Sequence, residues 1–290
     1  MTSAINNFKK YDDTSQELAQ RIHKSSSKEH TFSKNKSPSI ILETFKQMEL
    51  NQKIPGNYIK DTKAENLRKN FISWLFLIAP RIDISKDTIF NTISMVDNLF
   101  STIKTDEIYE PRNFQLLSVT CFFISYKIFE KKKITISFLE KSLLHGKWSQ
   151  DDIRRAEIFV LESLDYRIHL DNFYSFYKFF EIIIKTHFED SKVEQIQYLV
   201  YYIMQKSLKL QEFMFKITPL EQIIIILNTV FLVLQQLVKI EIEKYSSFFI
   251  ELTNITAKNQ FTEFEKFSTL LINNLAFTED FIEKFHKVYC

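Results

Sequence analysis

The chain has 290 residues, 45% of them hydrophobic and 26% charged, which is a globular composition long enough for one large domain or two of ordinary size. Its formal net charge of +2 is too small to make nucleic acid or an acidic membrane surface the expected partner. With only two glycines, Gly56 and Gly146, the chain lacks the turns of a β-sandwich or barrel and the glycine-rich loops that cradle phosphates.

The N-terminal part differs in composition from the rest. Residues 1–37 are rich in Ser, Lys and Asn without a periodic apolar pattern, so we predict a disordered tail. The first twenty residues are polar, and we expect no signal peptide. For residues 38–62 we predict a helix near 40–50 followed by an irregular linker. From Ile40 onward, apolar residues recur at helical spacing almost to the end of the chain.

Two runs of five helices are predicted after the linker. The first run is expected near residues 63–78, 86–101, 113–129, 136–145 and 150–163, and the second near 172–186, 191–208, 219–238, 241–253 and 262–274, with a short helix after 278. The predicted fold class is therefore all-α, with one five-helix domain over 63–169 and another over 170–290. The most apolar stretch, Ile223–Leu234, is too short to cross a bilayer and is predicted to be a buried core helix.

Helix starts carry the capping-box pattern, in which an N-cap hydroxyl accepts an amide hydrogen bond and an acid three residues later accepts one in return. The pairs that fit are Thr62 with Glu65, Ser137 with Glu140, Thr218 with Glu221, Thr262 with Glu265 and, in a weaker version, Ser149 with Asp152. Proline marks further boundaries, since Pro80 is predicted to end the first helix and Pro111 to lie in the loop before the third.

The sequence gives little support for enzyme chemistry. Cys121 and Cys290 are too few for a disulfide framework or a zinc site, which favours a reduced intracellular compartment. The six histidines are scattered, and neither a nucleophile elbow nor a dinucleotide-binding glycine motif occurs. We therefore expect a non-enzymatic protein with no catalytic residue, no metal and no cofactor.

Four segments match one family in order and spacing. They are Leu67–Leu75 (LRKNFISWL), Asp87–Ser101 (DTIFNTISMVDNLFS), Gln115–Glu130 (QLLSVTCFFISYKIFE) and Glu157–Ile168 (EIFVLESLDYRI). Together they resemble the first, second, third and fifth helices of the cyclin box. Upstream, Ile41–Tyr58 is similar to the extra N-terminal helix of mitotic A- and B-type cyclins, and Phe215–Leu234 is similar to part of a second box. The resemblance implies two cyclin boxes preceded by an extra helix.

The resemblance also implies a function. A cyclin binds a cyclin-dependent Ser/Thr protein kinase as a heterodimer and activates it in cell-cycle control, in the nucleus and cytoplasm. Lys127 and Glu157 match the family residues that bind backbone groups of the kinase's mobile αC helix and its flank. The apolar residues expected on the same surface, which otherwise would be ordinary core residues, are Ile128, Leu161, Tyr166 and Ile168.

Two further sets of residues follow from the resemblance. Arg68 and Asp97 match a structural salt bridge between the first two helices. A substrate-docking patch for Arg-x-Leu peptides of substrates or inhibitors would comprise Leu67, Asn70, Phe71, Trp74 and Gln115. The pattern departs from the family here, because Asn70 replaces an apolar residue and Leu77 replaces an acid that often pairs with the peptide's Arg. In the alternative, Phe71 and Trp74 belong to the core.

Two other functions stay open at this point. A transcription-factor-like cyclin fold that binds nucleic acid would need a strongly basic face, which the near-neutral charge disfavours. A cyclin-fold scaffold without a kinase partner is disfavoured by the presence of both Lys127 and Glu157. Neither a membrane nor a nucleic acid is expected as a partner.

Overall fold

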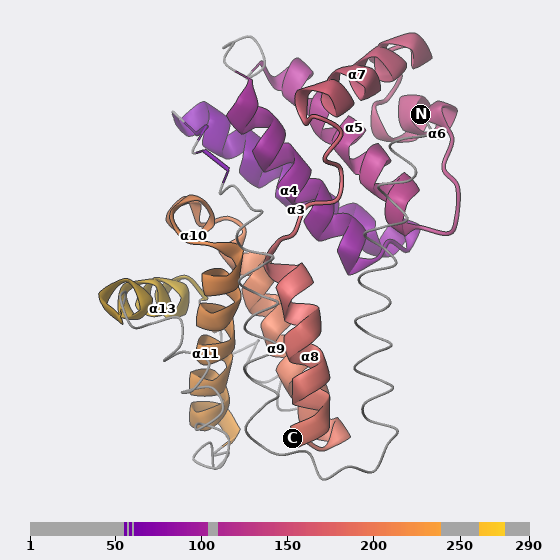
Figure 1. Cartoon of the computed structure of the whole chain (residues 1–290). Coiled ribbons are helices and arrows are strands. Elements are labelled where there is room, and N and C mark those ends of the chain that lie inside the picture. The colour runs from indigo at the N-terminus through magenta and orange to yellow at the C-terminus, as the bar shows by residue number, and fades with distance from the viewer. Residues whose placement is uncertain (1–54, 57, 60, 104–109, 239–260, 276–290) are drawn as a thin grey trace. The chain divides into compact units, whose positions relative to one another are not determined.

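The computed structural model describes residues 55–56, 58–59, 61–103, 110–238 and 261–275, and all of these lie within one compact unit, Phe45–Cys290. Regular secondary structure in these ranges is entirely helical (Figure 1), which confirms the all-α prediction. The predicted tail, the helix near 40–50, the helix near 241–253 and the helix after 278 lie outside the described residues.

The first helical set covers the region predicted as the first domain. Its elements are α3 (Thr62–Ile82), α4 (Lys86–Thr102), α5 (Pro111–Phe129), α6 (Ile136–Phe138) with the π-helix η2 (Leu139–Leu143), and α7 (Gln150–Ser163). Helix α5 packs against α4 and α7, while α3 packs against α4 and α5. Its core is dominated by aromatic residues such as Phe90, Phe100 and Phe122, each almost wholly buried. Burial of these rings supplies much of the hydrophobic stabilisation.

The second helical set follows a short connection. Its elements are α8 (Phe173–His187), α9 (Asp190–Ser207), α10 (Gln211–Lys216), α11 (Pro219–Val238) and α13 (Phe261–Leu275). Helix α11 packs against α8, α9 and α13, and it contains the apolar stretch predicted to be a core helix. Helix α10 was not predicted, because six residues are too few to show a helical period. Among the described residues, no helix combines the length and hydropathy needed to cross a membrane.

Two predicted capping boxes form as expected. The Ser149 hydroxyl accepts from the Asp152 amide at 3.2 Å, and the Asp152 carboxylate accepts from the Ser149 amide at 3.0 Å. At the start of α11, the Thr218 amide donates to the Glu221 carboxylate at 2.8 Å and the Glu221 amide donates back to the Thr218 hydroxyl at 3.2 Å. Both helices therefore begin where the sequence pattern places them.

In two other predicted capping boxes, the predicted N-cap residue is wrong by one or two positions. Helix α3 is capped by Asp61, whose carboxylate accepts from the amide of Ala64 at 2.8 Å, instead of by Thr62. Helix α6 is capped by Thr135 instead of Ser137. In each case an earlier side chain with a good acceptor reaches the first-turn amide. The side chains of Thr262 and Glu265 lie outside the described set.

The two proline predictions also need correction. Pro80 lies inside α3, which continues to Ile82 because the amide of Asp83 still donates to the carbonyl of Ala79. The helix ends at Asp83, which has a left-handed backbone with φ of 55°. Pro111 is the first residue of α5 instead of a loop residue, a position where a missing amide proton costs nothing.

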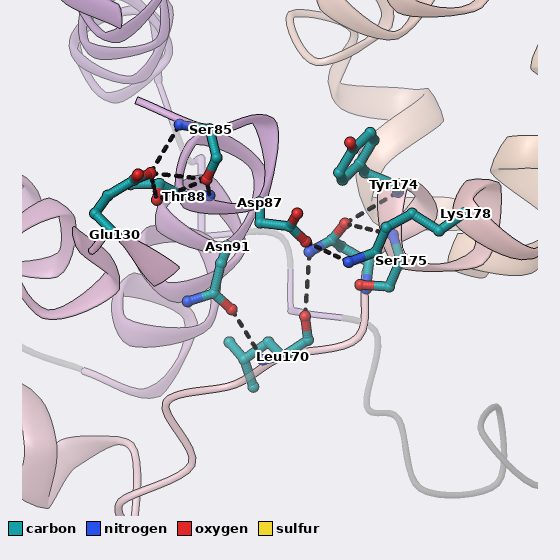
Figure 2. Close-up of polar contacts among 10 residues, drawn as sticks. Ser85, Asp87, Thr88, Asn91, Glu130, Leu170, Tyr174, Ser175 and Lys178 are labelled. Carbon is teal, nitrogen blue, oxygen red and sulfur yellow. Dashed lines mark hydrogen bonds and ion pairs between the residues drawn. The ribbon is translucent and has the colours of Figure 1, made fainter. Parts of the chain in front are cut away.

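Polar contacts join the first set to the second (Figure 2). The buried Asn91 of α4 accepts a hydrogen bond from the Leu170 amide at 3.0 Å and donates one to the Ile168 carbonyl at 2.9 Å. Lys178 of α8 pairs with Asp87 of α4 at 2.5 Å. These contacts fix the segment after α7, which matters because that segment carries predicted site residues.

Candidate functional site

Lys127 and Glu157 come from different helices and form an ion pair with each other. Lys127 lies in the last turn of α5 and Glu157 in the middle of α7. The Lys127 ammonium also lies 4.3 Å from the centre of the Phe123 ring, a cation–π contact. The side chains are 43% and 20% exposed, so both charged groups can be reached by a partner.

The local sequence explains why these two side chains stand at the edge of the core. In α5, the residues from Leu117 to Tyr126 are buried, and Lys127 is the first exposed residue after them. In α7, Ile153, Ala156 and Val160 face the core, which leaves Glu157 on the flank of the buried stripe. The pair therefore lies at the exposed edge of these two packed helices.

The four predicted apolar residues near this pair are all partly accessible. Ile128, Leu161 and Ile168 are half-buried, and Tyr166 is 57% exposed. None is a fully buried core residue. Ile158, which follows Glu157, is 55% exposed and extends the apolar surface of α7. The sequence reasoning missed Ile158, although its spacing of three residues from Leu161 places both on one face of the helix.

Tyr166 has an uncommon backbone conformation. Asp165 and Tyr166 have φ angles of 51° and 55°, in the left-handed region that residues other than glycine rarely adopt. The Tyr166 amide donates to the Leu161 carbonyl at 2.8 Å, which closes the turn after α7. With Asn91 holding the next residues, this turn presents the Tyr166 ring to solvent. Strain of this kind clusters at functional sites.

Arg68 and Asp97 form a buried, two-pronged ion pair between α3 and α4. The guanidinium Nε and Nη2 donate to the two carboxylate oxygens, each at 2.8 Å, and the side chains are only 2% and 3% exposed. The hydroxyl of Tyr58 also donates to the carboxylate at 2.9 Å. Burial alone would lower the pKa of the Arg68 guanidinium, but the charge and hydrogen bonds of Asp97 outweigh it and hold that pKa above its ordinary value.

Comparison of the sequence with known proteins finds a matching family model and several relatives. The model of the cyclin N-terminal domain matches residues 40–169, and S-phase entry cyclin-6 of Saccharomyces cerevisiae is 31% identical over 121 residues. Residues 40–169 are therefore a cyclin N-terminal domain. The aligned part covers 40% of this chain and 30% of that relative. G2/mitotic-specific cyclin-4 of the same yeast is 30% identical over 117 residues, covering 39% of this chain and 24% of the relative.

A solved structure supports the same fold. The viral cyclin from herpesvirus saimiri superposes with a TM-score of 0.53 at 16% identity, and the match covers 87% of this chain and all of the viral chain. An identity this low shows the fold alone. The family model ends at residue 169, so a second cyclin box over residues 170–290 stays a prediction. The part of the chain that matches the two yeast relatives spans less than a third of their length.

The predicted docking patch is only partly at the surface. Phe71 is 8% exposed and its ring stacks on Trp74 with centres 5.6 Å apart, so it belongs to the core. Trp74, Leu67 and Gln115 are half-buried and Asn70 is exposed. Any docking on this side of α3 would therefore depend on Trp74 and its neighbours more than on Phe71.

Metal and thiol chemistry has no assembled site in the part of the chain that the structure describes. Within it, no three His, Cys, Asp or Glu side chains come together as metal ligands. Cys121 is buried in α5, and that burial raises the pKa of its thiol far above the ordinary value. A thiol kept protonated in this way is a poor nucleophile.

Proposed function

We propose that this cyclin binds a cyclin-dependent Ser/Thr protein kinase as a heterodimer and activates it in cell-cycle control. The observation that carries the proposal is the Lys127–Glu157 pair, which is accessible and flanked by partly exposed apolar side chains. A surface that combines a few apolar anchors with accessible charges is typical of a protein interface. A location in the nucleus and cytoplasm is part of this proposal.

The proposed mechanism is a shift in the conformation of the kinase. A protein kinase is active only when the αC helix brings its Glu to the β3 Lys. The Lys127 ammonium would donate to backbone carbonyls at the flank of that helix, and the Glu157 carboxylate would accept from backbone amides. Ile128, Leu161, Tyr166 and Ile168 would bury apolar residues of the same helix. The cyclin itself supplies no reacting group.

The energy needed is within reach of such an interface. A ligand must prefer one of two states by about 5.5 kcal/mol to move a population from about 1:99 to 99:1. Interfaces that bury about 1,600 Å² supply preferences of this size when their anchors are well packed. A surface that fits only the active position of αC would therefore suffice to activate the kinase.

A charge-swap experiment separates a binding role of the pair from a structural one. Lys127→Glu alone and Glu157→Lys alone place like charges together, whereas the double variant Lys127→Glu/Glu157→Lys restores an attractive pair with reversed polarity. We expect all three variants to lose kinase capture and kinase activation, because the polarity offered to the kinase backbone is wrong in each. Recovery of capture in the double variant would show that the pair serves the fold only.

The matched control is another exposed ion pair between elements of the first set. Lys63 and Glu110 pair at 2.9 Å with side chains that are 50% and 62% exposed. The double variant Lys63→Glu/Glu110→Lys makes the same change in charge away from the proposed surface. It should retain capture and activation, measured by pull-down with a purified cyclin-dependent kinase and by phosphate transfer to a peptide substrate.

The kinase pull-down, together with a DNA-binding assay on the wild-type chain, discriminates the scaffold and nucleic-acid-binding alternatives. A kinase-independent scaffold would capture no kinase even as the wild-type chain. A nucleic-acid-binding cyclin fold would instead shift a DNA probe, which the net charge of +2 does not favour.

Docking of Arg-x-Leu peptides from substrates or inhibitors near Trp74 is a separate part of the proposal. It is tested by loss of peptide binding in Trp74→Ala.

A further inference from the structure

Three lysines gather where α3 approaches the end of α9. Lys69 lies on α3, Lys206 in the last turn of α9, and Lys209 just after it. The ammonium of Lys209 donates to the hydroxyl of Ser73 on α3 at 2.8 Å, which ties the two elements together. Partial burial, and then the like charges of Lys206 and Lys69, lower the pKa of the Lys209 ammonium. The charges of Lys206 and Lys69 therefore both act on the Lys209 ammonium.

The acids of the described residues neutralise this cluster only in part. Lys69 pairs with Glu65 at 2.5 Å, whereas the contact that Lys206 makes among the described residues is with the ring of Tyr202, at 5.2 Å from its centre. The next acid in the sequence, Glu212, is engaged by other lysines, Lys216 at 3.3 Å and Lys266 at 3.8 Å. Like charges held together without counter-charges cost stability in the free protein. An acidic partner would remove that cost.

An apolar residue continues the same row on α3. Lys69, Ser73 and Leu77 are spaced by four residues, so they lie one above another on one face of the helix. Leu77 is 57% exposed, one of the largest apolar exposures among the described residues. Leu77 also lies three residues after Trp74, so the row borders the predicted docking patch along α3. Together with Lys206 and Lys209, the row forms a surface on other elements than Lys127 of α5 and Glu157 of α7.

We propose that this surface, made by Lys69, Ser73, Leu77, Lys206 and Lys209, docks an acidic peptide segment of a partner protein. Carboxylates of the segment would lie among the three ammonium groups, and an apolar residue would cover Leu77. Lysine suits this role because its ammonium is a mobile point charge that adapts to irregularly spaced carboxylates. The inference goes beyond the proposed function and does not depend on kinase binding.

The test uses the full chain and two labelled peptides that each contain one Leu and differ only in four Glu residues replaced by four Gln. Fluorescence anisotropy at low salt should show the acidic peptide binding about tenfold more tightly than the neutral one, and the preference should fall as salt rises. Lys206→Ser/Lys209→Ser should abolish the preference. Leu77→Ser should weaken both peptides alike, since it removes an apolar contact only.

The control is Lys141→Ser/Lys147→Ser, which removes two exposed lysines from the η2 region and the loop after it. It should leave the preference unchanged. Equal affinity for the two peptides in the wild-type chain, or an equal loss in the control variant, would overturn the inference. So would tighter binding of a single-stranded DNA of the same length through the same lysines. Kinase capture by Lys206→Ser/Lys209→Ser is measured in parallel, and we expect it to be unchanged.

Discussion

Arg68 donates a hydrogen bond of 2.5 Å to the carbonyl oxygen of Leu208, a residue of the second helical set. The same guanidinium holds both oxygens of Asp97 and lies 5.2 Å from the centre of the Phe215 ring. One buried charge therefore joins α3, α4 and the segment between α9 and α10. Only the planar guanidinium of arginine can donate hydrogen bonds to both Asp97 oxygens and to the Leu208 carbonyl at once, so lysine is not an equivalent residue here.

Asp97→Asn should be strongly destabilising. The change leaves the Arg68 guanidinium buried without its counter-charge, which costs about 3–5 kcal/mol in the free energy of unfolding. Urea denaturation measures this difference directly. The control Glu110→Gln, in an exposed ion pair, should cost less than about 1 kcal/mol. Equal effects of the two substitutions would mean that Asp97 contributes no more than a surface acid.

Glu130 should stabilise the start of α4 from the end of α5. One oxygen of its carboxylate accepts from the Ser85 amide and the Ser85 hydroxyl, each at 2.7 Å, and from the Thr88 hydroxyl (Figure 2). Glu130→Ala leaves these donors without their acceptor and should cost about 1–3 kcal/mol. Glu130→Gln keeps a carbonyl acceptor but loses the charge near the helix N-terminus, so thermal unfolding should place it between wild type and Glu130→Ala.

Asp152 should contribute to stability in a pH-dependent way. Hydrogen bonds from the Ser149 hydroxyl and amide, and then from Arg155, lower the pKa of its carboxyl from 3.8 to about 2. Because the folded-state pKa lies below the unfolded value, the contribution is present above about pH 4 and is lost as the pH falls through about 2.

The measurement compares wild type with Asp152→Asn over this range. The difference in the free energy of unfolding should be largest near about pH 6 and should shrink towards zero only below about pH 2. Ser149→Ala, which removes one of the donors, should show the same trend with a smaller difference. A difference that stays constant with pH would rule out the carboxylate as its source.

Tyr166→Asn should separate binding from folding. Asparagine tolerates the left-handed backbone of this position better than tyrosine, and the ring it removes is 57% exposed, so stability should change by less than about 1 kcal/mol. If Tyr166 is an anchor for the kinase, capture should fall at least about tenfold. Ile182→Asn removes an apolar side chain that is 41% exposed on α8 and should leave capture unchanged. Unaltered capture in Tyr166→Asn would remove this residue from the proposed surface.

The helices were predictable because their apolar residues repeat at a fixed spacing. The periodicity placed α4 over 86–101 against an observed Lys86–Thr102, and α11 over 219–238 as observed. The predicted helix boundaries were wrong where a neighbouring residue capped the helix instead. Asp61 caps the start of α3, and Asp83, with its left-handed backbone, ends that helix after Pro80. The predicted helix over 136–145 became a short α-helix and a π-helix, since the Leu144 amide donates to the Leu139 carbonyl at 2.8 Å.

The candidate site was predictable only through resemblance. Spacing alone gives no reason to join Lys127 to Glu157, because they are 30 residues apart and α6 and η2 lie between them. The family pattern named both residues, and the structure adds that they pair with each other and remain accessible. Ile158 and Asn91 had no motif to mark them, and only their exposure and hydrogen bonds reveal their place beside the site.

By itself, the sequence determined that this protein is helical and where most helices lie, because periodicity and capping act over a few neighbouring residues. The tertiary structure decided which charges meet: Arg68 with the carbonyl of Leu208, Glu130 with Ser85, and Lys209 with Ser73. Such contacts join residues dozens of positions apart, and each depends on how several helices pack at once. No spacing rule encodes that packing, so the charged surfaces of this protein emerge only from the folded chain.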